Sequence, residues 1–253
     1  MKSIHVVCLL LGAITFGFGQ SGFERKMFVQ DQDSLPYRLL LPADYNENQT
    51  YPVLFFLHGA GERGADNEKQ LTHGKSFLEE ANTVFGAIVV APQCPADSYW
   101  SNVAVDRTAS GNIFHFKDGG TPTHAMKLLM GLLDNVLTTY SVKSEAVYVG
   151  GLSMGGMGTF ELVSRRPGVF AAAFPVCGGA HPDLAAGIAE TNWWLFHGDA
   201  DRVVDVSYSK TMLDALTEAK AQVRFTLYEN VGHDSWNPTF LEPALLPWLF
   251  SKR

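Results

Sequence analysis

The stretch 146–158 constrains the fold of this 253-residue chain more than any other part of it. It passes from apolar, β-prone residues through a glycine-flanked turn into a segment of helical character. Within it, Gly151-Leu152-Ser153-Met154-Gly155 fits the pattern G-x-S-x-G, in which a tight strand-to-helix turn lifts a serine hydroxyl above a sheet. A side chain at Gly151 or Gly155 should collide where the backbone doubles back, and only glycine adopts such torsions at low cost. The pattern predicts a nucleophile elbow with Ser153 as the candidate nucleophile.

Apolar runs alternate with helical patterns around this stretch. Besides the elbow strand, strands are expected at 24–29, 36–41, 51–57, 87–91, 169–176, 192–197 and 223–228. Helices are expected at 77–84, at 123–140, after the elbow as far as Arg166, at 206–219 and at 239–250, whereas 92–120 is expected to be a long loop. This alternation predicts an α/β fold with a mostly parallel central sheet flanked by helices.

The N-terminus and the charge limit where the protein works and what it binds. Residues 1–19 combine Lys2, an apolar run and small residues near a cut before Gln20, which predicts a signal peptide and export to the periplasm or beyond. The apolar run is short for a membrane span, so the alternative of a stable membrane anchor is disfavoured. A net charge of −7 without any basic run argues against nucleic acid as a partner. Residues 20–253 are expected to form one catalytic domain, and no feature indicates an oligomeric state.

Cysteine usage indicates neither a disulfide nor a metal site. Cys94 and Cys177 follow strands that should not be neighbours in the predicted sheet, which favours two free, buried thiols. No H-E-x-x-H pattern and no paired cysteines occur, so neither a zinc ion nor another cofactor is expected.

A serine hydroxyl needs a base within hydrogen-bond reach to act as a nucleophile. His233 follows the last predicted strand and comes after the candidate acids, so the chain order is serine, acid, histidine. The loop after the strand 192–197 offers Asp199, Asp201 and Asp205; Asp205 is best interpreted as a helix cap, and Asp199 as a brace of backbone amides. The remaining histidines are expected to have structural or surface roles: His58, His73, His115, His124, His181 and, as a packing residue, His197.

An oxyanion needs preorganised donors, which backbone amides commonly supply. One is predicted at Met154, directly after the nucleophile, and the other at Ala60 in the glycine-rich turn His58-Gly59-Ala60-Gly61. In the same turn, Glu62 and Arg63 are expected to pair with each other.

With these residues in place, the sequence resembles small serine esterases of the α/β-hydrolase superfamily, in the bacterial branch of predicted peptidases and carboxylesterases related to feruloyl esterases and polyhydroxybutyrate depolymerase-like enzymes. The matching stretches are 51–64, 91–95, 151–156, 197–201 and 232–236. The resemblance implies that the second aspartate of His197-Gly198-Asp199-Ala200-Asp201 is the acid of the triad, hence Asp201. It also implies an α/β-hydrolase fold without a large lid domain and no cofactor.

These features predict a secreted carboxylesterase that forms an acyl-enzyme on Ser153. Only a short segment separates Val176 from Asn192, where many lipases insert a lid, and an uncapped site suits bulky extracellular esters such as acylated or feruloylated plant polysaccharide fragments. Candidate substrate-binding residues are Gln93, Trp100 and Trp236. The alternatives are a serine peptidase of the same fold and a hydrolase-fold protein that binds partners without catalysis.

Overall fold

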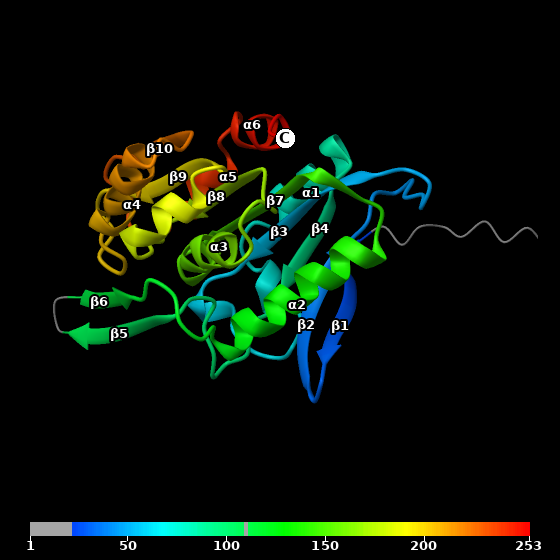
Figure 1. Cartoon of the computed structure of the whole chain (residues 1–253), viewed down its shortest axis with the longest axis horizontal. Coiled ribbons are helices and arrows are strands. Elements are labelled where there is room, and N and C mark those ends of the chain that lie inside the picture. Colours follow the sequence, from blue (N-terminus) through cyan, green and yellow to red (C-terminus); the bar gives the residue numbers. More distant parts are fainter. Residues whose placement is uncertain (1–21, 109–110) are drawn as a thin grey trace, which may run out of the picture.

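An eight-stranded sheet forms the centre of the computed structural model, which describes residues 22–108 and 111–253 (Figure 1). Its strand order is β1-β2-β4-β3-β7-β8-β9-β10. Strands β1 and β2 form an antiparallel pair, β2 is antiparallel to β4, and every pair from β4 to β10 is parallel. The expected mostly parallel sheet is therefore confirmed. The predicted signal peptide at 1–19 lies outside the described residues.

The strands of this sheet coincide closely with the apolar runs of the sequence. They are β1 (Glu24–Gln30), β2 (Asp33–Leu40), β3 (Tyr51–Leu57), β4 (Ile88–Pro92), β7 (Val142–Leu152), β8 (Ala172–Val176), β9 (Asn192–Gly198) and β10 (Val223–Tyr228). Strand β8 begins three residues later than expected, because residues 169–171 lead from the preceding helix into the sheet.

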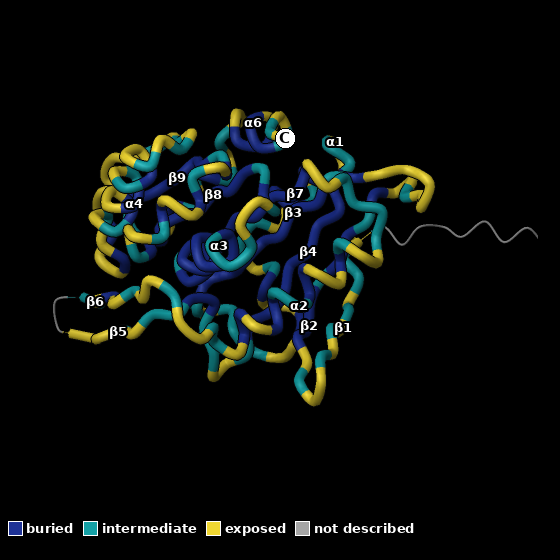
Figure 2. Tube along the Cα trace, in the orientation of Figure 1, coloured by how far each residue is buried: buried dark blue, intermediate teal, exposed yellow. Residues whose placement is uncertain are grey.

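Helices cover both faces of the sheet and enclose two separate apolar cores. The α-helices are α1 (Lys75–Phe85), α2 (His124–Thr139), α3 (Met154–Arg165), α4 (Ser207–Glu218), α5 (Trp236–Phe240) and α6 (Leu245–Phe250). Alternate residues of β3 divide between the cores: Val53, Phe55 and Leu57 pack in the core that includes α2 and α3 residues, whereas Leu54 and Phe56 pack in the core that includes α1 and α6 residues. The central strands are accordingly buried on both faces (Figure 2).

The segment 92–120 contains a β-hairpin where the sequence predicted a loop. Strands β5 (Val103–Thr108) and β6 (Gly111–Phe116) pair antiparallel and project from the body below α4 in Figure 1. Most side chains of the hairpin are at least partly exposed, so neither strand has the continuous apolar run that identified the central strands.

The predicted closing helix 239–250 is also corrected, because it is two short helices. Helix α5 ends at Phe240 and α6 begins at Leu245. Pro243 lies between them, and its missing N–H and ring prevent the first helix from continuing.

The part of the chain that the structure describes also bears on the cysteines and on the expected absence of a lid, whereas the apolar run at 1–19 lies outside it. Cys94 and Cys177 are free and buried, as predicted, because β3 and β7 separate the strands that precede them. Among the described helices, none is both long and apolar enough to cross a membrane. Between β8 and β9, where a lid could be inserted, the described chain forms only a short 3-10 helix, η3 (Pro182–Ile188).

Candidate active site

Ser153 lies between the end of β7 and the start of α3, at a sharp turn. Its backbone has φ 53° and ψ −116°, a left-handed conformation that is strained for a residue with a side chain. The predicted steric role of the glycines holds: a Cβ on Gly151 would lie 2.5 Å from the carbonyl oxygen of Leu57, and one on Gly155 would overlap the same carbonyl. The unusual torsion, however, falls on Ser153 and on neither glycine. The backbone of Ser153 thus adopts the strained conformation of this turn, and the two glycines provide the space for it.

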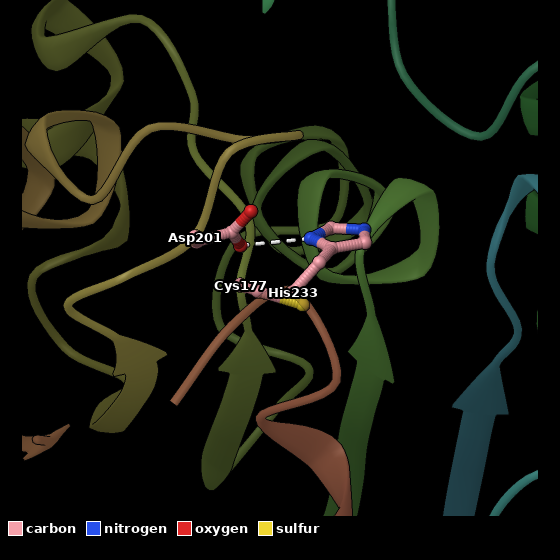
Figure 3. Close-up of side chains that lie close together, drawn as sticks. All are labelled: Cys177, Asp201 and His233. Carbon is pink, nitrogen blue, oxygen red and sulfur yellow. Dashed lines mark hydrogen bonds and ion pairs between the residues drawn. The ribbon is translucent and has the colours of Figure 1, made fainter. Parts of the chain in front are cut away.

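The side chains of Ser153, His233 and Asp201 form one continuous chain of contacts. Nε2 of His233 lies 2.9 Å from Oγ of Ser153, and Nδ1 lies 2.7 Å from Oδ2 of Asp201. Figure 3 shows Asp201 and His233 pointing toward one another above Cys177. Ser153 follows β7, Asp201 follows β9 and His233 follows β10, so the three meet at the carboxyl edge of the sheet, where ligands gather in such folds.

Asp201 is held as an ionised carboxylate although its side chain is fully buried. Burial by itself raises the pKa of this carboxyl, but hydrogen bonds from His197 and His233 outweigh it and hold the pKa well below its usual range. The other oxygen, Oδ1, accepts from the amides of Val203 and Val204 at 2.8 and 3.0 Å. A buried carboxylate with these donors can orient His233 and stabilise an imidazolium.

Two other aspartates of this loop, residues 199–206 (the acid loop), have the structural roles expected of them. Asp199 accepts from the amide of Asn230 at 2.7 Å, which ties the acid loop to the loop that carries His233. The amide of Ala200 donates to the carbonyl of Val231 and reinforces this connection. Asp205 precedes the N-cap residue Val206 and accepts from the amide of Ser207, so it satisfies the first amide of α4.

The two predicted oxyanion donors both stand at the start of a helical segment. Met154 is the first residue of α3, and Ala60 is the first residue of the 3-10 helix η1 (Ala60–Glu62). Amides at such positions have no acceptor within their own helix, so they are free to bind an anion. Arg63 donates from Nε to the carbonyl of Ala60 at 3.0 Å and so restrains this loop.

His58 supports the same loop and is kept neutral, consistent with its expected structural role. Its Nε2 accepts from the amide of Cys94 at 2.9 Å, so the proton is on Nδ1, which lies 2.7 Å from the carbonyl of Gly59. Burial lowers the pKa of His58 to about 4, and the bond to Gly59 offsets only part of that shift.

Of the three candidate substrate-binding residues, only Trp236 stands beside the triad. Its ring is partly exposed and lies edge-on to His233, with ring centroids 5.4 Å apart. Gln93 and Trp100 are fully buried, which corrects their expected role in contacting substrate. The side-chain Nε2 of Gln93 donates to the carbonyl of Glu62 and to Oδ1 of Asp66, and its Oε1 accepts from the backbone amide of Asn67. These hydrogen bonds brace the loop after β3.

The expected pairing of Glu62 with Arg63 is wrong. Glu62 faces His73, with Oε1 3.7 Å from Nε2, and the ring of His73 packs against Trp236 at a centroid distance of 5.1 Å. Arg63 instead bonds the carbonyls of Ala60 and Ser98. The two neighbouring side chains therefore have separate partners.

Several residues near the triad were not anticipated from the sequence. His197, expected to be a packing residue, lies with Nε2 3.2 Å from Oδ2 of Asp201. The hairpin is fastened to the acid loop and α4: Asn112 donates to the carbonyl of Val203, and the hydroxyl of Tyr208 accepts from the amide of Phe114. The alternation of apolar residues at 103, 105, 114 and 116 around Ser110-Gly111 is the sequence signal that could have revealed the hairpin.

Cys177, Asp201 and His233 have potential metal-ligating atoms within 4.8 Å of one another (Figure 3). The arrangement does not suit a resident metal ion, because Nδ1 of His233 already donates to Asp201. Burial and the nearby charge of Asp201 also raise the pKa of the Cys177 thiol, which disfavours the thiolate that a metal requires.

Comparisons with known proteins agree with this fold. The family model described as "Putative esterase" matches residues 32–210. A thermostable esterase of known structure is 33% identical, with a TM-score of 0.81, over 91% of this chain and 63% of its own, so the chain spans less than two thirds of that protein. A comparison with curated protein sequences finds no match.

Two more distant structures share the fold alone. The ferulic acid esterase of Anaeromyces mucronatus, solved in complex with ferulic acid, is 15% identical with a TM-score of 0.64, over 91% of this chain and 90% of its own. Dipeptidyl peptidase 4 of Porphyromonas gingivalis is also 15% identical, with a TM-score of 0.65, over 91% of this chain and 35% of its own. Because the family model matches well over half of the sequence and the fold agrees with it, the chain belongs to this esterase family and has the α/β-hydrolase fold.

Proposed function

We propose that the protein is a serine carboxylic-ester hydrolase that works through Ser153, His233 and Asp201. The observation that carries the proposal is the unbroken chain of contacts from a strained elbow hydroxyl to a buried carboxylate, at 2.9 and 2.7 Å. Nucleophile, base and orienting acid are each within hydrogen-bond reach of the next, as acyl transfer requires.

In the acylation half of the proposed reaction, Oγ of Ser153 forms a bond to the ester carbonyl carbon while its proton moves to Nε2 of His233. The carbonyl electrons collect on oxygen, where the amides of Ala60 and Met154 supply hydrogen bonds. The carbonyl then re-forms, the bond to the alkoxy group breaks, and His233 returns its proton to the departing alcohol. Asp201 stabilises the imidazolium between these two transfers.

Deacylation repeats the same steps with water as the nucleophile. His233 takes a proton from water as its oxygen attacks the acyl carbon, and the same two amides hold the oxyanion. When that intermediate collapses, Ser153 leaves and regains its proton from His233, and the carboxylic acid departs. No other group is needed for the balance of atoms and protons.

Extracellular esters with aromatic or sugar parts are the substrate class that we propose. The partly exposed ring of Trp236 beside His233 offers a stacking surface for a planar acyl group or a sugar. The short η3 in place of a lid supports a role on bulky substrates such as acylated or feruloylated polysaccharide fragments. Export through residues 1–19 is part of the same proposal and rests on the sequence pattern.

The test uses the purified protein, a fluorophosphonate and three substrates. Intact mass should show one adduct on the wild type, and p-nitrophenyl acetate and methyl ferulate should be turned over. Ser153→Ala should abolish both. Ser144→Ala is the matched control, because Ser144 is exposed near the other end of the same strand. Absence of adduct and turnover in folded wild-type protein would refute the proposal, and preferential cleavage of a peptide p-nitroanilide would favour a peptidase.

A further inference from the structure

Arg63 ties the turn 59–63 (the oxyanion loop), which carries one predicted oxyanion donor, to a distant part of the chain. Its guanidinium donates from Nε to the carbonyl of Ala60 at 3.0 Å and from Nη1 to the carbonyl of Ser98 at 3.1 Å. Arg63 and Ser98 are 35 residues apart in sequence. Because a guanidinium is planar and its donors have fixed directions, the two bonds together hold the loop in one place.

The donor residue Ala60 is restrained on both sides. The peptide unit that carries its amide also carries the carbonyl of Gly59, which accepts from the amide of Glu62 at 3.3 Å and lies 2.7 Å from Nδ1 of His58. The next peptide unit carries the carbonyl of Ala60, which accepts from Arg63. Because each peptide unit is planar, bonds to these two carbonyls restrict the rotation of both units and so fix the direction of the Ala60 N–H.

The other end of the Arg63 bridge lies in residues 98–100 (the bridging segment), which pack against α3. The hydroxyl of Tyr99 donates to Sδ of Met157 at 3.9 Å. Trp100 approaches the same helix so closely that a Cβ on Gly158 would lie 2.4 Å from the Cβ of Trp100. Both contacts are in the first turns of α3, the helix that begins with the other predicted oxyanion donor.

The bridging segment is itself firmly held. Oγ1 of Thr123 donates to the carbonyl of Tyr99 at 2.6 Å, and the amide of Ala125 donates to Oγ of Ser98 at 3.0 Å, so the start of α2 fixes the segment. Cζ of Arg63 lies over the ring of Tyr99, 5.8 Å from its centroid, which adds a cation–π contact to the bridge. Burial raises the pKa of Tyr99 to about 12, so the phenol stays protonated and keeps its hydrogen bond to α3.

We propose that Arg63 and Tyr99 are positioning residues that set the spacing between the two oxyanion donors, the amides of Ala60 and Met154. The inference rests on the proposed function, because it needs both amides to bind the same oxygen. The two donors belong to separate parts of the chain, and the Arg63–Tyr99 bridge connects them. Oxyanion stabilisation depends on donors that are fixed before the charge develops. A misplacement of about 1 Å can lower the rate roughly 100-fold.

The first test compares Arg63→Lys with the wild type on two matched ketones. Phenethyl trifluoromethyl ketone takes Oγ of Ser153 onto its carbonyl carbon as the proton moves to His233, and its oxygen then carries the charge at the two amides. Phenethyl methyl ketone has nearly the same shape and remains a ketone. Arg63→Lys keeps the charge but loses the fork that bonds two carbonyls.

The variant should therefore lose kcat/KM for p-nitrophenyl acetate and affinity for the fluorinated ketone in parallel, by roughly 10- to 100-fold. Its affinity for the methyl ketone should stay within about threefold of wild type, because that ligand forms no oxyanion. Equal losses of affinity for both ketones would show a merely structural role and refute the inference, as would wild-type kcat/KM in Arg63→Lys.

Arg38→Lys is the matched control. Arg38 also donates to two backbone carbonyls, those of Phe23 and Asn67, at 2.9 and 2.5 Å. Both carbonyls lie outside the oxyanion loop and the bridging segment, so the kinetics and both ketone affinities of Arg38→Lys should match the wild type.

The second test is a double-mutant cycle with Tyr99→Leu, which removes both the ring beside the guanidinium and the hydroxyl on Met157. If Arg63 and Tyr99 act as one bridge, the double variant should lose little more kcat/KM than the more impaired single variant. Losses that multiply would show two independent effects and overturn the coupling.

A readout without activity separates this inference from the proposed function. The amides of Glu62 and Gly64 bond the carbonyls of Gly59 and Cys94, and their hydrogen exchange should be at least about tenfold faster in Arg63→Lys than in Arg38→Lys. Unchanged exchange would count against the restraint. Faster exchange, with a wild type that shows neither fluorophosphonate adduct nor turnover, would refute the proposed function and leave the restraint intact.

Discussion

Replacing Asp201 by asparagine should change the tautomer of His233 and remove its function as a base. The carboxylate accepts on both oxygens: Oδ1 from the amides of Val203 and Val204, and Oδ2 from His233 and His197. An asparagine must put its NH2 group in one of these two places. Facing the backbone, it would leave the amides of Val203 and Val204 without an acceptor, at a cost of about 1–3 kcal/mol for the buried amide of Val204 alone. Facing His233, it meets a ring that can move its proton to the other nitrogen.

The second orientation is therefore favoured, and it turns Nε2 of His233 into a donor toward Ser153. A base in the wrong tautomer should lower kcat by about 10³- to 10⁴-fold, or about 4–5.5 kcal/mol of transition-state stabilisation. The assay is steady-state hydrolysis of p-nitrophenyl acetate, with circular dichroism to verify folding. Asp199→Asn is the matched control, because Asp199 accepts from one backbone amide and does not contact the triad; its kcat should stay within tenfold of wild type. A loss of less than tenfold in Asp201→Asn would refute the reasoning.

Three other perturbations test the elbow, the aromatic wall and the pH dependence. Gly155→Ala should lower the free energy of unfolding by at least about 1–3 kcal/mol and abolish turnover, because its Cβ would overlap the rigid carbonyl of Leu57; urea titration checks this, and Gly187→Ala, whose Cβ meets open space, should be nearly neutral. Trp236→Ala should raise KM for methyl ferulate roughly 2- to 10-fold through lost stacking, with a smaller effect on p-nitrophenyl acetate; equal effects on both esters would contradict a stacking role. His58 has its pKa lowered by burial to about 4, so the unfolded chain binds more protons between about pH 6.5 and pH 4, and stability is lost as pH falls through that range, by up to about 3 kcal/mol. His58→Gln should flatten this dependence in urea titrations, and an unchanged slope would count against it.

The candidate catalytic residues could be predicted from the sequence because each lies in a short, contiguous sequence pattern. The elbow is one contiguous stretch, and its glycines are required by contacts that any strand–turn–helix of this kind makes. Each candidate side chain follows an apolar run, and the carboxyl ends of parallel strands meet at one edge. Their positions directly after predicted parallel strands therefore placed Ser153, Asp201 and His233 at the same edge of the sheet, as the structure has them.

Side chains outside the regular strands were harder to predict, because their neighbours come from elsewhere in the chain. Trp100 and Gln93 lie in the segment that follows β4, where exposure could not be inferred from periodicity, and both are buried. Glu62 lies near His73 and Arg63 binds backbone carbonyls, so the two do not pair with each other. In each case the sequence supplied the residue type and tertiary packing supplied its partner.

The sequence by itself indicated the strands of the central sheet, the elbow with Ser153, and His233 as its candidate base; the choice of Asp201 among three aspartates needed the family resemblance as well. The strands and the elbow depend on hydrophobic periodicity and on steric limits within a few residues. Only the tertiary structure decided that Ser153 reaches His233 across 80 residues of sequence, and that the buried His58 and His197 have different hydrogen-bond partners. Protonation and hydrogen bonding inside a protein depend on which groups share a water-free space, and that is settled by how distant segments pack.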